Sequence, residues 1–435
     1  MGYFSIVTII RGIIGLLSLV FISYLLSNNK KIIKWKTVVI SLLIQFFIAV
    51  SILKISLIQS AFETISKFFV RIINYTASGS TFLFSSLVDK ENSSYIFAFQ
   101  VLPIIIFFSA LTSLLYHLGV IQKIVSFLAW LLNRFLKITG AESLSLAGNI
   151  FLGQTESPLL IKSYLEKMTK PQLFVVMVGG MSTVAGSVLA AYIGLLGGND
   201  VTEQLKFATH LLTASVMAAP GAVAVSKIIF PDLEKNSEHS TEIKKEKTKG
   251  NILLSITSGT IEGVKLAVNV GAMLLVFLAF IALFNDIMWL IGDLLNFNVL
   301  ISETTNFNQF SIEFVLGYLL APLMWLIGVT YQECALMGQL LGIKIVSSEF
   351  VAFIQLADFR NTETPISLLS KKSITMATFM LCGFANLASI GIQIGGIGVL
   401  APKQRKQLSE LGFKAMIGGT VVSLISACFA GILII

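Results

Sequence analysis

Apolar residues fill most of this chain in long runs, and short polar or basic segments separate the runs. A helix of about 20 apolar residues crosses the hydrocarbon core of a bilayer. The runs that reach this length are 4–26, 37–59, 97–118, 172–196, 207–229, 252–290, 374–400 and 413–435. The pattern predicts an all-α polytopic membrane protein with about eight transmembrane helices.

Other runs have the spacing of helices that lie at a membrane surface. Between residues 62 and 73 the apolar side chains share one helical face, and Glu63, Lys67 and Arg71 occupy the opposite face. This arrangement favours a helix in the interface over one that crosses the bilayer. The runs 121–138 and 314–329 are similar, and 252–290 is long enough for a tilted span and a continuation along the outer surface. We therefore expect interfacial helices beside the spans.

The stretch LSLAGNIFLGQTESPLL, residues 144–160, is apolar at both ends and polar in the middle. Each arm is too short to cross the bilayer as a helix. Basic residues, which mark the cytoplasmic side, flank both ends: Arg134, Lys137, Lys162, Lys167 and Lys170. The stretch is therefore predicted to be a re-entrant hairpin with Gln154, Thr155 and Glu156 at its tip. Ser157 and Pro158 predict a half-helix that starts at Pro158.

A second stretch, 334–354, has the same design, with Val346-Ser347-Ser348-Glu349 in its middle and no basic excess around it. It is expected to enter from the opposite side. The motif GMSTVAG (180–186) follows the first stretch and GFANLAS (383–389) follows the second. Both motifs should interrupt their helices, because Gly and short polar side chains weaken the helical hydrogen bonds. Two opposed hairpins and two interrupted helices predict an inverted repeat, as in secondary transporters.

Composition and charge support this interpretation. The chain has 435 residues, of which 55% are hydrophobic and 12% charged, with a mean hydropathy of +0.86. The net charge of +8 comes from Lys and Arg in short loops. The positive-inside rule explains those loops and places both termini outside, so nucleic-acid binding is not expected. Cys334, Cys382 and Cys428 lie far apart and are expected to be apolar packing residues.

The same reasoning divides the chain into four parts. Residues 1–118 would form N-terminal spans and an interfacial helix on the scaffold side, and 119–230 the first repeat. Residues 231–250 form a polar cytoplasmic linker, and 251–435 the second repeat. The expected cytoplasmic loops are 30–36, 235–249 and 403–406.

Two acidic residues occupy positions that are predicted to lie within the membrane. An ionised carboxylate at mid-membrane costs about 3 kcal/mol even on lenient scales, so Glu156 and Glu349 point to function. A structural partner for each acid is the simpler alternative. For Thr183, Ser187, Asn386 and Ser389 the alternative is helix–helix hydrogen bonding. His117 and His210 are interpreted as structural, because neither has a ligand partner at suitable spacing.

Four segments resemble the concentrative nucleoside transporter family. They are GNIFLGQTESP, GGMSTVAGSVLAAY, LLGIKIVSSEFVAF and CGFANLASIGIQIGGIGVLAPKQR. The resemblance, which extends over nearly the whole chain, implies an ion-coupled symporter that imports nucleosides by alternating access, with sodium preferred and a proton possible. It also implies a homotrimer in the plasma (inner) membrane and no organic cofactor.

Carried over by position, the resemblance implies a substrate site between the two tips and the two interrupted helices. Gln154, Thr155 and Glu156 would face the nucleobase with Val188 packed against it. Glu349, Asn386 and Ser389 would hold the ribose hydroxyls, and Phe384 would line the pocket. A sodium site would use Asn149, the carbonyl of Leu152, Thr183 and the carbonyl of Val184. Ser348 and Phe353 depart from the family's usual Asn and Tyr.

Two other function classes fit parts of the pattern. One is a non-transporting, gate-like membrane regulator built on a related core. The other is a membrane hydrolase in which Glu156 and Glu349 act as an acid–base pair on a glycosidic bond. The sequence contains no recognisable nucleophile motif, so an enzyme is not expected.

Overall fold

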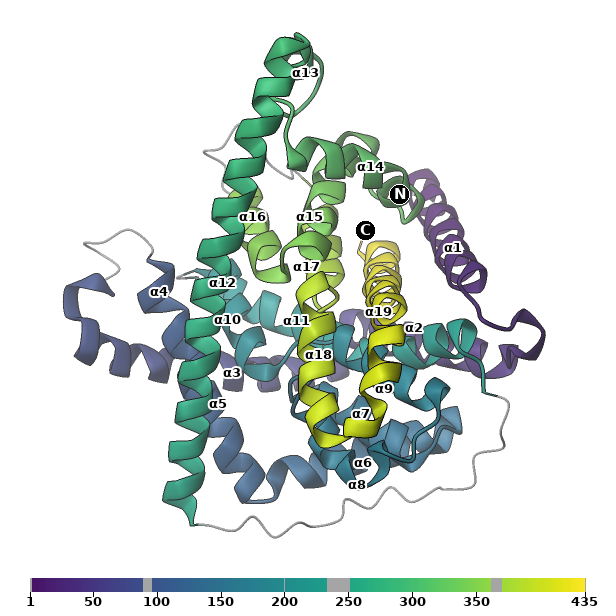
Figure 1. Ribbon diagram of the computed structural model, residues 1–435, viewed down its shortest axis with the longest axis vertical. Helices are drawn as coiled ribbons and strands as arrows, with labels where there is room; N and C mark the ends of the chain where they lie inside the picture. Colours follow the sequence, from purple (N-terminus) through teal and green to yellow (C-terminus); the bar gives the residue numbers. More distant parts are fainter. Residues whose placement is uncertain (1, 89–95, 199, 233–250, 361–369, 435) are drawn as a thin grey trace.

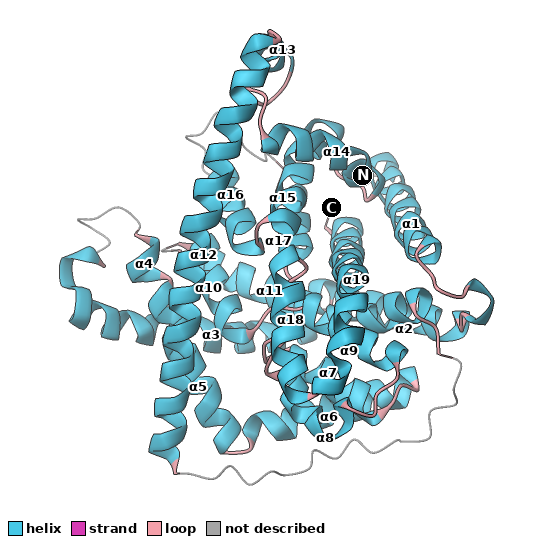
Figure 2. Cartoon of the chain, in the orientation of Figure 1, coloured by secondary structure: helices cyan, strands magenta, loops and turns pink. Residues whose placement is uncertain are grey.

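The computed structural model describes residues 2–88, 96–198, 200–232, 251–360 and 370–434, and every regular element in those ranges is helical (Figure 1, Figure 2). This agrees with the predicted fold class. The predicted linker, apart from its first two residues, lies outside the described ranges.

The N-terminal part contains two long apolar helices and one long amphipathic helix. Its elements are α1 (Gly2–Leu25), η1 (Lys30–Ile32), α2 (Trp35–Lys54), α3 (Ser56–Phe84), η2 (Ser85–Leu87), α4 (Phe97–Gln100), α5 (Leu102–His117) and α6 (Val120–Leu136). The predicted span 37–59 is wrong at its end. Ile55 is extended, so α2 stops at Lys54, and α3 runs further in both directions than the surface helix expected at 62–73.

The middle of the chain contains the first polar-centred stretch and an interrupted helix. Its elements are α7 (Gly140–Asn149), η3 (Ser157–Ile161), α8 (Lys162–Leu165), α9 (Lys170–Met181), α10 (Gly186–Gly197) and α11 (Val201–Ile229). The predicted span 172–196 is α9 and α10, separated by a break inside the GMSTVAG motif.

The C-terminal part repeats this order after one very long helix. Its elements are α12 (Ile252–Leu294), α13 (Phe297–Thr304), α14 (Ile312–Leu326), η4 (Tyr331–Glu333), α15 (Cys334–Val346), α16 (Glu349–Arg360), α17 (Lys371–Leu381), α18 (Leu387–Leu400), η5 (Pro402–Gln404) and α19 (Arg405–Leu433). The helix α12 is unbroken for 43 residues. It therefore has no break at which a separate surface continuation could begin.

By length and composition, seven helices in the described residues could cross a membrane. These helices correspond to seven of the eight predicted spans, with some differences at the ends. The eighth, 374–400, is the pair α17 and α18, which is interrupted between Leu381 and Leu387. The chain is thus an all-helical, multi-pass membrane protein. In Figure 1 α1 begins and α19 ends toward the same end of the molecule, away from α6 and α8.

The helices differ widely in burial. The candidate span over α9 and α10 is 100% buried, whereas that of α12 is 11% buried. The long helix α12 packs chiefly on α5. A Cβ at Gly259 or Gly263 would come within 2.9 Å of backbone atoms of α5, so these glycines permit the close helix–helix approach. The remaining faces of α12 carry exposed apolar side chains.

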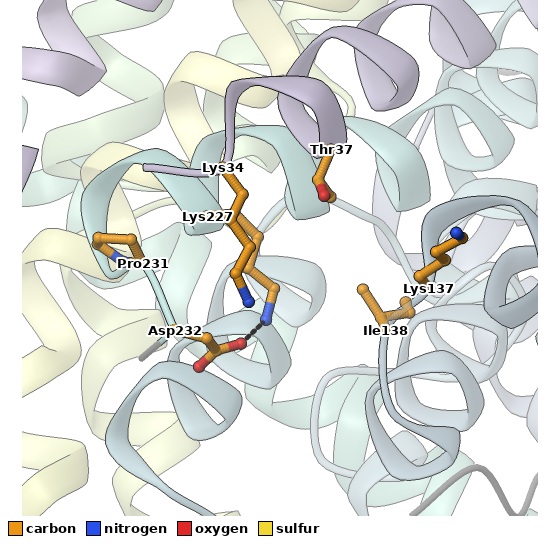
Figure 3. Close-up of a pocket in the computed structure, with 7 residues that line it drawn as sticks. All are labelled: Lys34, Thr37, Lys137, Ile138, Lys227, Pro231 and Asp232. Atoms are coloured by element: carbon orange, nitrogen blue, oxygen red, sulfur yellow. Dashed lines mark hydrogen bonds and ion pairs between the residues drawn. The ribbon is translucent and has the colours of Figure 1, made fainter. Parts of the chain in front are cut away.

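A buried ion cluster fixes the start of α7 to the end of α11. Lys227 is 7% exposed and its ammonium lies 2.7 Å from Glu142 Oε1. It also pairs with Asp232, beside a cavity of about 30 Å³ bordered by Lys34 and Lys137 (Figure 3). The other oxygen of Glu142 accepts from the Thr139 backbone at 2.8 Å and completes a capping box. One carboxylate thus caps α7 and anchors it.

We expect Lys227→Met to destabilise the protein by about 3–5 kcal/mol, because two buried carboxylates would lose their cation. The measurement is the thermal midpoint of the purified protein in detergent. The control is Lys170→Met, which removes the exposed Lys170–Glu410 pair (2.7 Å) and should change the midpoint little. Equal shifts for the two variants would contradict an anchoring role.

Candidate functional site

The first polar tip lies where α7 turns back into η3. The Ser157 hydroxyl donates to the Ser145 carbonyl at 2.6 Å and ties the two arms together. At the tip the Gly153 N–H donates to Glu156 Oε2 at 3.3 Å. The expected half-helix at Pro158 is a short 3₁₀ helix that begins at Ser157. Ser157 does not cap it, because its hydroxyl is bonded to the other arm.

The second polar tip joins α15 to α16 through Ser347 and Ser348. Across the arms, Gln339 Nε2 donates to Gln355 Oε1 at 3.2 Å. The helix α16 starts at Glu349, which is 4% exposed. Both predicted tips are therefore turns between two packed arms. Whether either hairpin is re-entrant stays a prediction.

The two interrupted helices meet at their breaks. The Phe384 N–H, from the break between α17 and α18, donates to the Thr183 carbonyl in the break between α9 and α10, at 3.2 Å. A Cβ at Gly383 would lie 3.0 Å from the Met181 carbonyl oxygen, so a glycine is needed for this approach. Asn386 then caps α18 by accepting from the Ser389 N–H at 2.8 Å. The breaks satisfy backbone groups that helices would otherwise leave unpaired.

Glu349 has a partner on each oxygen. The Tyr192 hydroxyl donates to Oε1 at 3.0 Å, and Asn386 Nδ2 donates to Oε2 at 2.7 Å. Tyr192 is on α10, so the second tip is bonded to an interrupted helix of each half. A carboxylate has about four acceptor positions. These two donors hold Glu349 in place and leave it able to accept further hydrogen bonds.

Gln154 makes the corresponding link from the first tip. Its Nε2 donates to Ser389 Oγ at 3.1 Å, and its Oε1 accepts from Gln393 Nε2 at 3.1 Å. Both partners are on α18. A Cβ at Gly180 would lie 3.0 Å from the Gln154 Cβ, so this glycine makes room for the tip. The structure thus brings Gln154, Glu349, Asn386 and Ser389 into one region around the breaks.

A cavity of about 670 Å³ lies beside the first tip. The tip and α10 contribute Glu156 and Ser187, and α5 and α12 contribute the opposite wall. The lining residues are Ser109, Thr112, Ser113, Tyr116, Phe151, Leu152, Glu156, Leu159, Lys162, Ala185, Gly186, Ser187 and Glu262. Glu156 is exposed to this space, whereas Gln154, Glu349, Asn386 and Ser389 are buried and do not line it. Glu262 and Lys265 are three residues apart on α12, but they form no ion pair with each other.

The remaining predicted substrate residues lie close by in the fold. Val188 is 2% exposed on α10, and Thr155 and Phe384 are half-buried. The Thr155 side chain packs on α18, because a Cβ at Gly396 would lie 2.7 Å from its methyl group. The two histidines are away from the tips, on α5 and α11. No group of three His, Cys, Asp or Glu suited to a metal occurs within the described ranges.

The predicted sodium residues surround the end of α9. Asn149 is 1% exposed, and neither atom of its amide has a hydrogen-bond partner. A Cβ at Gly179 would lie 3.4 Å from Asn149 Nδ2, which places this amide against the last turns of α9. The Thr183 hydroxyl donates to the Gly179 carbonyl at 3.0 Å, so its lone pairs stay available. Leu152 and Val184 are buried. An orphaned buried amide fits a cation bound there.

Three residues at the centre were missed as individual candidates. Tyr192 and Gln393 lie inside the motif segments and bond to Glu349 and Gln154. Lys344 lies in the apolar run LLGIKIV and is completely buried. A lysine in such a run is itself a signal, and so is a tyrosine two turns beyond a helix break. Phe353 packs on the Tyr192 ring, with centroids 4.2 Å apart.

Three family models match the chain. The model for the C-terminal part of Na⁺-dependent nucleoside transporters matches residues 210–431, and the model for the N-terminal part matches 14–87. A model named Gate and described as nucleoside recognition matches 98–199. Together these matches cover most of the chain.

Relatives are similar along the whole chain. An uncharacterised transporter of Haemophilus influenzae is 38% identical over 429 residues, which are 98% of each chain. Sodium/nucleoside cotransporter 2 of Rattus norvegicus is 36% identical over 96% of this chain, which spans only 62% of that longer protein.

Solved structures of the transporter CNTnw have the same fold. An inward-facing, substrate-bound structure has a TM-score of 0.88 and 36% identity and covers 98% of each chain. An outward-facing structure of a variant has a TM-score of 0.88 and 34% identity, with 98% of this chain and 97% of that chain covered.

Single cysteines test whether the cavity admits solvent. Ser187 lines it, whereas Leu189, two residues further along α10, is 1% exposed and does not. We expect Ser187→Cys in purified protein to react with a small maleimide much faster than Leu189→Cys. The wild type serves as the baseline, because its three cysteines are buried. Similar rates for the two variants would contradict an open cavity.

Proposed function

We propose that this chain, which belongs to the sodium-dependent nucleoside transporter family, imports nucleosides by alternating access and couples this import to a cation. Members of the family are transporters and not enzymes, so the hydrolase alternative is set aside. The proposal is supported most by the meeting of both polar tips with both helix breaks. Polar groups grouped at interrupted helices are typical of substrate sites in secondary transporters.

The nucleoside would lie between the tips. Glu349 keeps free acceptor positions, although Tyr192 and Asn386 already orient it, so it suits the donor hydroxyls of a ribose. Asn386 and Ser389 would complete the ribose side. Gln154, Thr155 and Glu156 would face the base, with Val188 and Phe384 as its apolar contacts. The bonds of Gln154 to α18 would have to rearrange as the base binds, because both ends of its amide are already paired.

Sodium is the preferred coupling ion, and the orphaned Asn149 amide supports it. Asn149, Thr183 and the carbonyls of Leu152 and Val184 would bind the ion at the end of α9, where the helix dipole favours a cation. The ion and the first tip share one hairpin, so ion and substrate should each tighten the binding of the other. A proton carried by Glu156 or Glu349 is the alternative coupling ion.

The cavity beside Glu156 supports an inward-open state. Lys162, on the basic flank of the first hairpin, lines this cavity, and basic flanks are expected on the cytoplasmic side. The opposite wall belongs to α5 and α12, which would form the scaffold. Relatives captured in both inward-facing and outward-facing states are consistent with movement between two such arrangements. We further propose both termini outside, a homotrimer and the inner membrane as the location.

A gate-like regulator is the second candidate. The match of residues 98–199 to the Gate model favours it, because that model covers the first tip and the first break. A regulator would bind a nucleoside without moving it. A measurement of nucleoside flux across the membrane therefore distinguishes a transporter from a regulator.

Uptake into proteoliposomes tests the proposal. Labelled uridine or adenosine should accumulate when sodium is higher outside than inside, and it should leave the vesicles when the gradient is reversed. Accumulation driven only by a pH gradient would favour the proton. Sodium-dependent binding without flux would favour the regulator. Chemically altered nucleoside in the vesicles would overturn a transport function.

The role of Glu349 is tested by changing protein and substrate together. A hydrogen bond to a charged group is worth about 1.5–3 kcal/mol. Glu349→Gln should therefore weaken uridine binding about tenfold or more, at 1.4 kcal/mol per decade. Removing a ribose hydroxyl from the substrate should cost this variant much less than it costs the wild type. Glu156→Gln is the matched control, and it should alter base preference instead.

The control for folding is the thermal midpoint of each variant, measured before the binding constants. If the losses from Glu349→Gln and from the deoxy substrate simply add, then the carboxylate and that hydroxyl do not interact. Additive losses would remove Glu349 from the ribose side.

A further inference from the structure

Lys344 is a completely buried cation in the first arm of the second tip. No part of its side chain is exposed (0%). Its ammonium donates to the Met380 carbonyl at 2.8 Å and reaches Ser423 Oγ at 3.4 Å. Among the described residues no Asp or Glu lies within ion-pair distance of it. A cation buried in a membrane protein without an ion-pair partner is expensive and therefore points to function.

The ammonium lies at the C-terminal end of a half-helix. Met380 is the last residue but one of α17, which ends at Leu381 where the break begins. The last carbonyls of a helix lack intrahelical partners and carry the negative end of its dipole. Ser423 Oγ is also within 3.4 Å of the Cys382 carbonyl. Two oxygen atoms thus contact the ammonium, and the Cys382 carbonyl lies next to one of them.

The first break has a neutral donor at the corresponding position. Met177 precedes the GMSTVAG motif by the same spacing as Met380 precedes GFANLAS. The Met177 carbonyl accepts from the neutral amide of Gln393 at 3.0 Å. The end of α9 therefore carries no fixed cation, and the unpaired amide of Asn149 lies beside it. The two breaks differ by one built-in positive charge.

We propose that Lys344 is a built-in cation at the C-terminal end of α17, where the first half of the chain has a bound coupling ion at the C-terminal end of α9. This inference rests on the proposed cation site at α9. If this is correct, the protein needs only one cation from solution for each nucleoside that it transports. Without the ammonium, the oxygens of Met380, Cys382 and Ser423 form a site for a second monovalent cation, because half-helix C-terminal ends bind sodium in transporters of this general design.

The test is Lys344→Met, which keeps an unbranched side chain of similar length and removes the ammonium. The charge moved per nucleoside is measured in proteoliposomes from the current and the labelled uptake together. We expect about one positive charge per nucleoside in the wild type and about two in the variant, with a steeper dependence of uptake on sodium concentration. Lys344→Arg keeps the charge and should behave as the wild type.

Lys372, at the start of α17, provides a matched control. Its ammonium also donates to a carbonyl, that of Gly328 at 3.0 Å, but at the opposite end of α17. Lys372→Met should leave the charge per nucleoside unchanged. A folded Lys344→Met that still moves the wild-type charge, with the wild-type sodium dependence, overturns the inference. Failure of the wild type to couple sodium at all overturns the proposed function instead, independently of any variant.

If Lys344→Met transports too poorly for the charge to be measured, the effect of sodium on its thermal stability tests the inference instead. A ligand that binds the folded state raises the thermal midpoint, and each added cation steepens the dependence on its concentration. The midpoint of Lys344→Met should rise about twice as steeply with the logarithm of sodium concentration as that of the wild type, with choline chloride as the ionic-strength control. If sodium does not restore stability while Lys344→Arg folds normally, the ammonium is only structural, and the inference is wrong.

Discussion

Helix ends inside a membrane have no water to satisfy their backbone groups, and the centre of this protein is organised by that constraint. Two interrupted helices create four such ends. The chain sets the breaks against each other, through Phe384 and Thr183, and brings one polar tip to each of them. Gln154 and Glu349 bond to groups of the opposite half. The residues that bond around the breaks thus include those proposed above as ligands of the substrate.

Local sequence patterns predict much of this fold. Run lengths predict the spans because the bilayer fixes the length of a crossing helix, and the GMSTVAG and GFANLAS motifs predict the breaks. The pairings at the site are different. Gln154 meets Gln393 across 239 positions of sequence, and no local pattern encodes such a contact. The end of α2 at Lys54 was also missed, and so was the 3₁₀ helix at Ser157, where the bond from the Ser157 hydroxyl to the Ser145 carbonyl replaces a helix cap.

The proposed transport cycle requires a well-bonded site to open, and the weak packing of α12 is relevant to this requirement. The α5 and α12 pair is held by its own glycine contacts, and α12 touches the rest of the molecule only weakly. The cavity lies at this boundary, with α5 and α12 on one side and the first tip on the other. In the proposed cycle, movement at this boundary would expose or cover Glu156 and leave the bonds around Glu349 intact. A rigid site would then be compatible with a movable wall.

The polar groups around the two breaks are in two different conditions. Glu349 is paired with Tyr192 and Asn386, and Gln154 is paired with Ser389 and Gln393. Asn149 alone among the predicted ligand residues keeps an amide with no partner on either atom. A buried polar group without a partner costs about 1–3 kcal/mol. The unpaired buried amide is therefore at the first break, whereas at the second break the Lys344 ammonium binds the carbonyl of Met380.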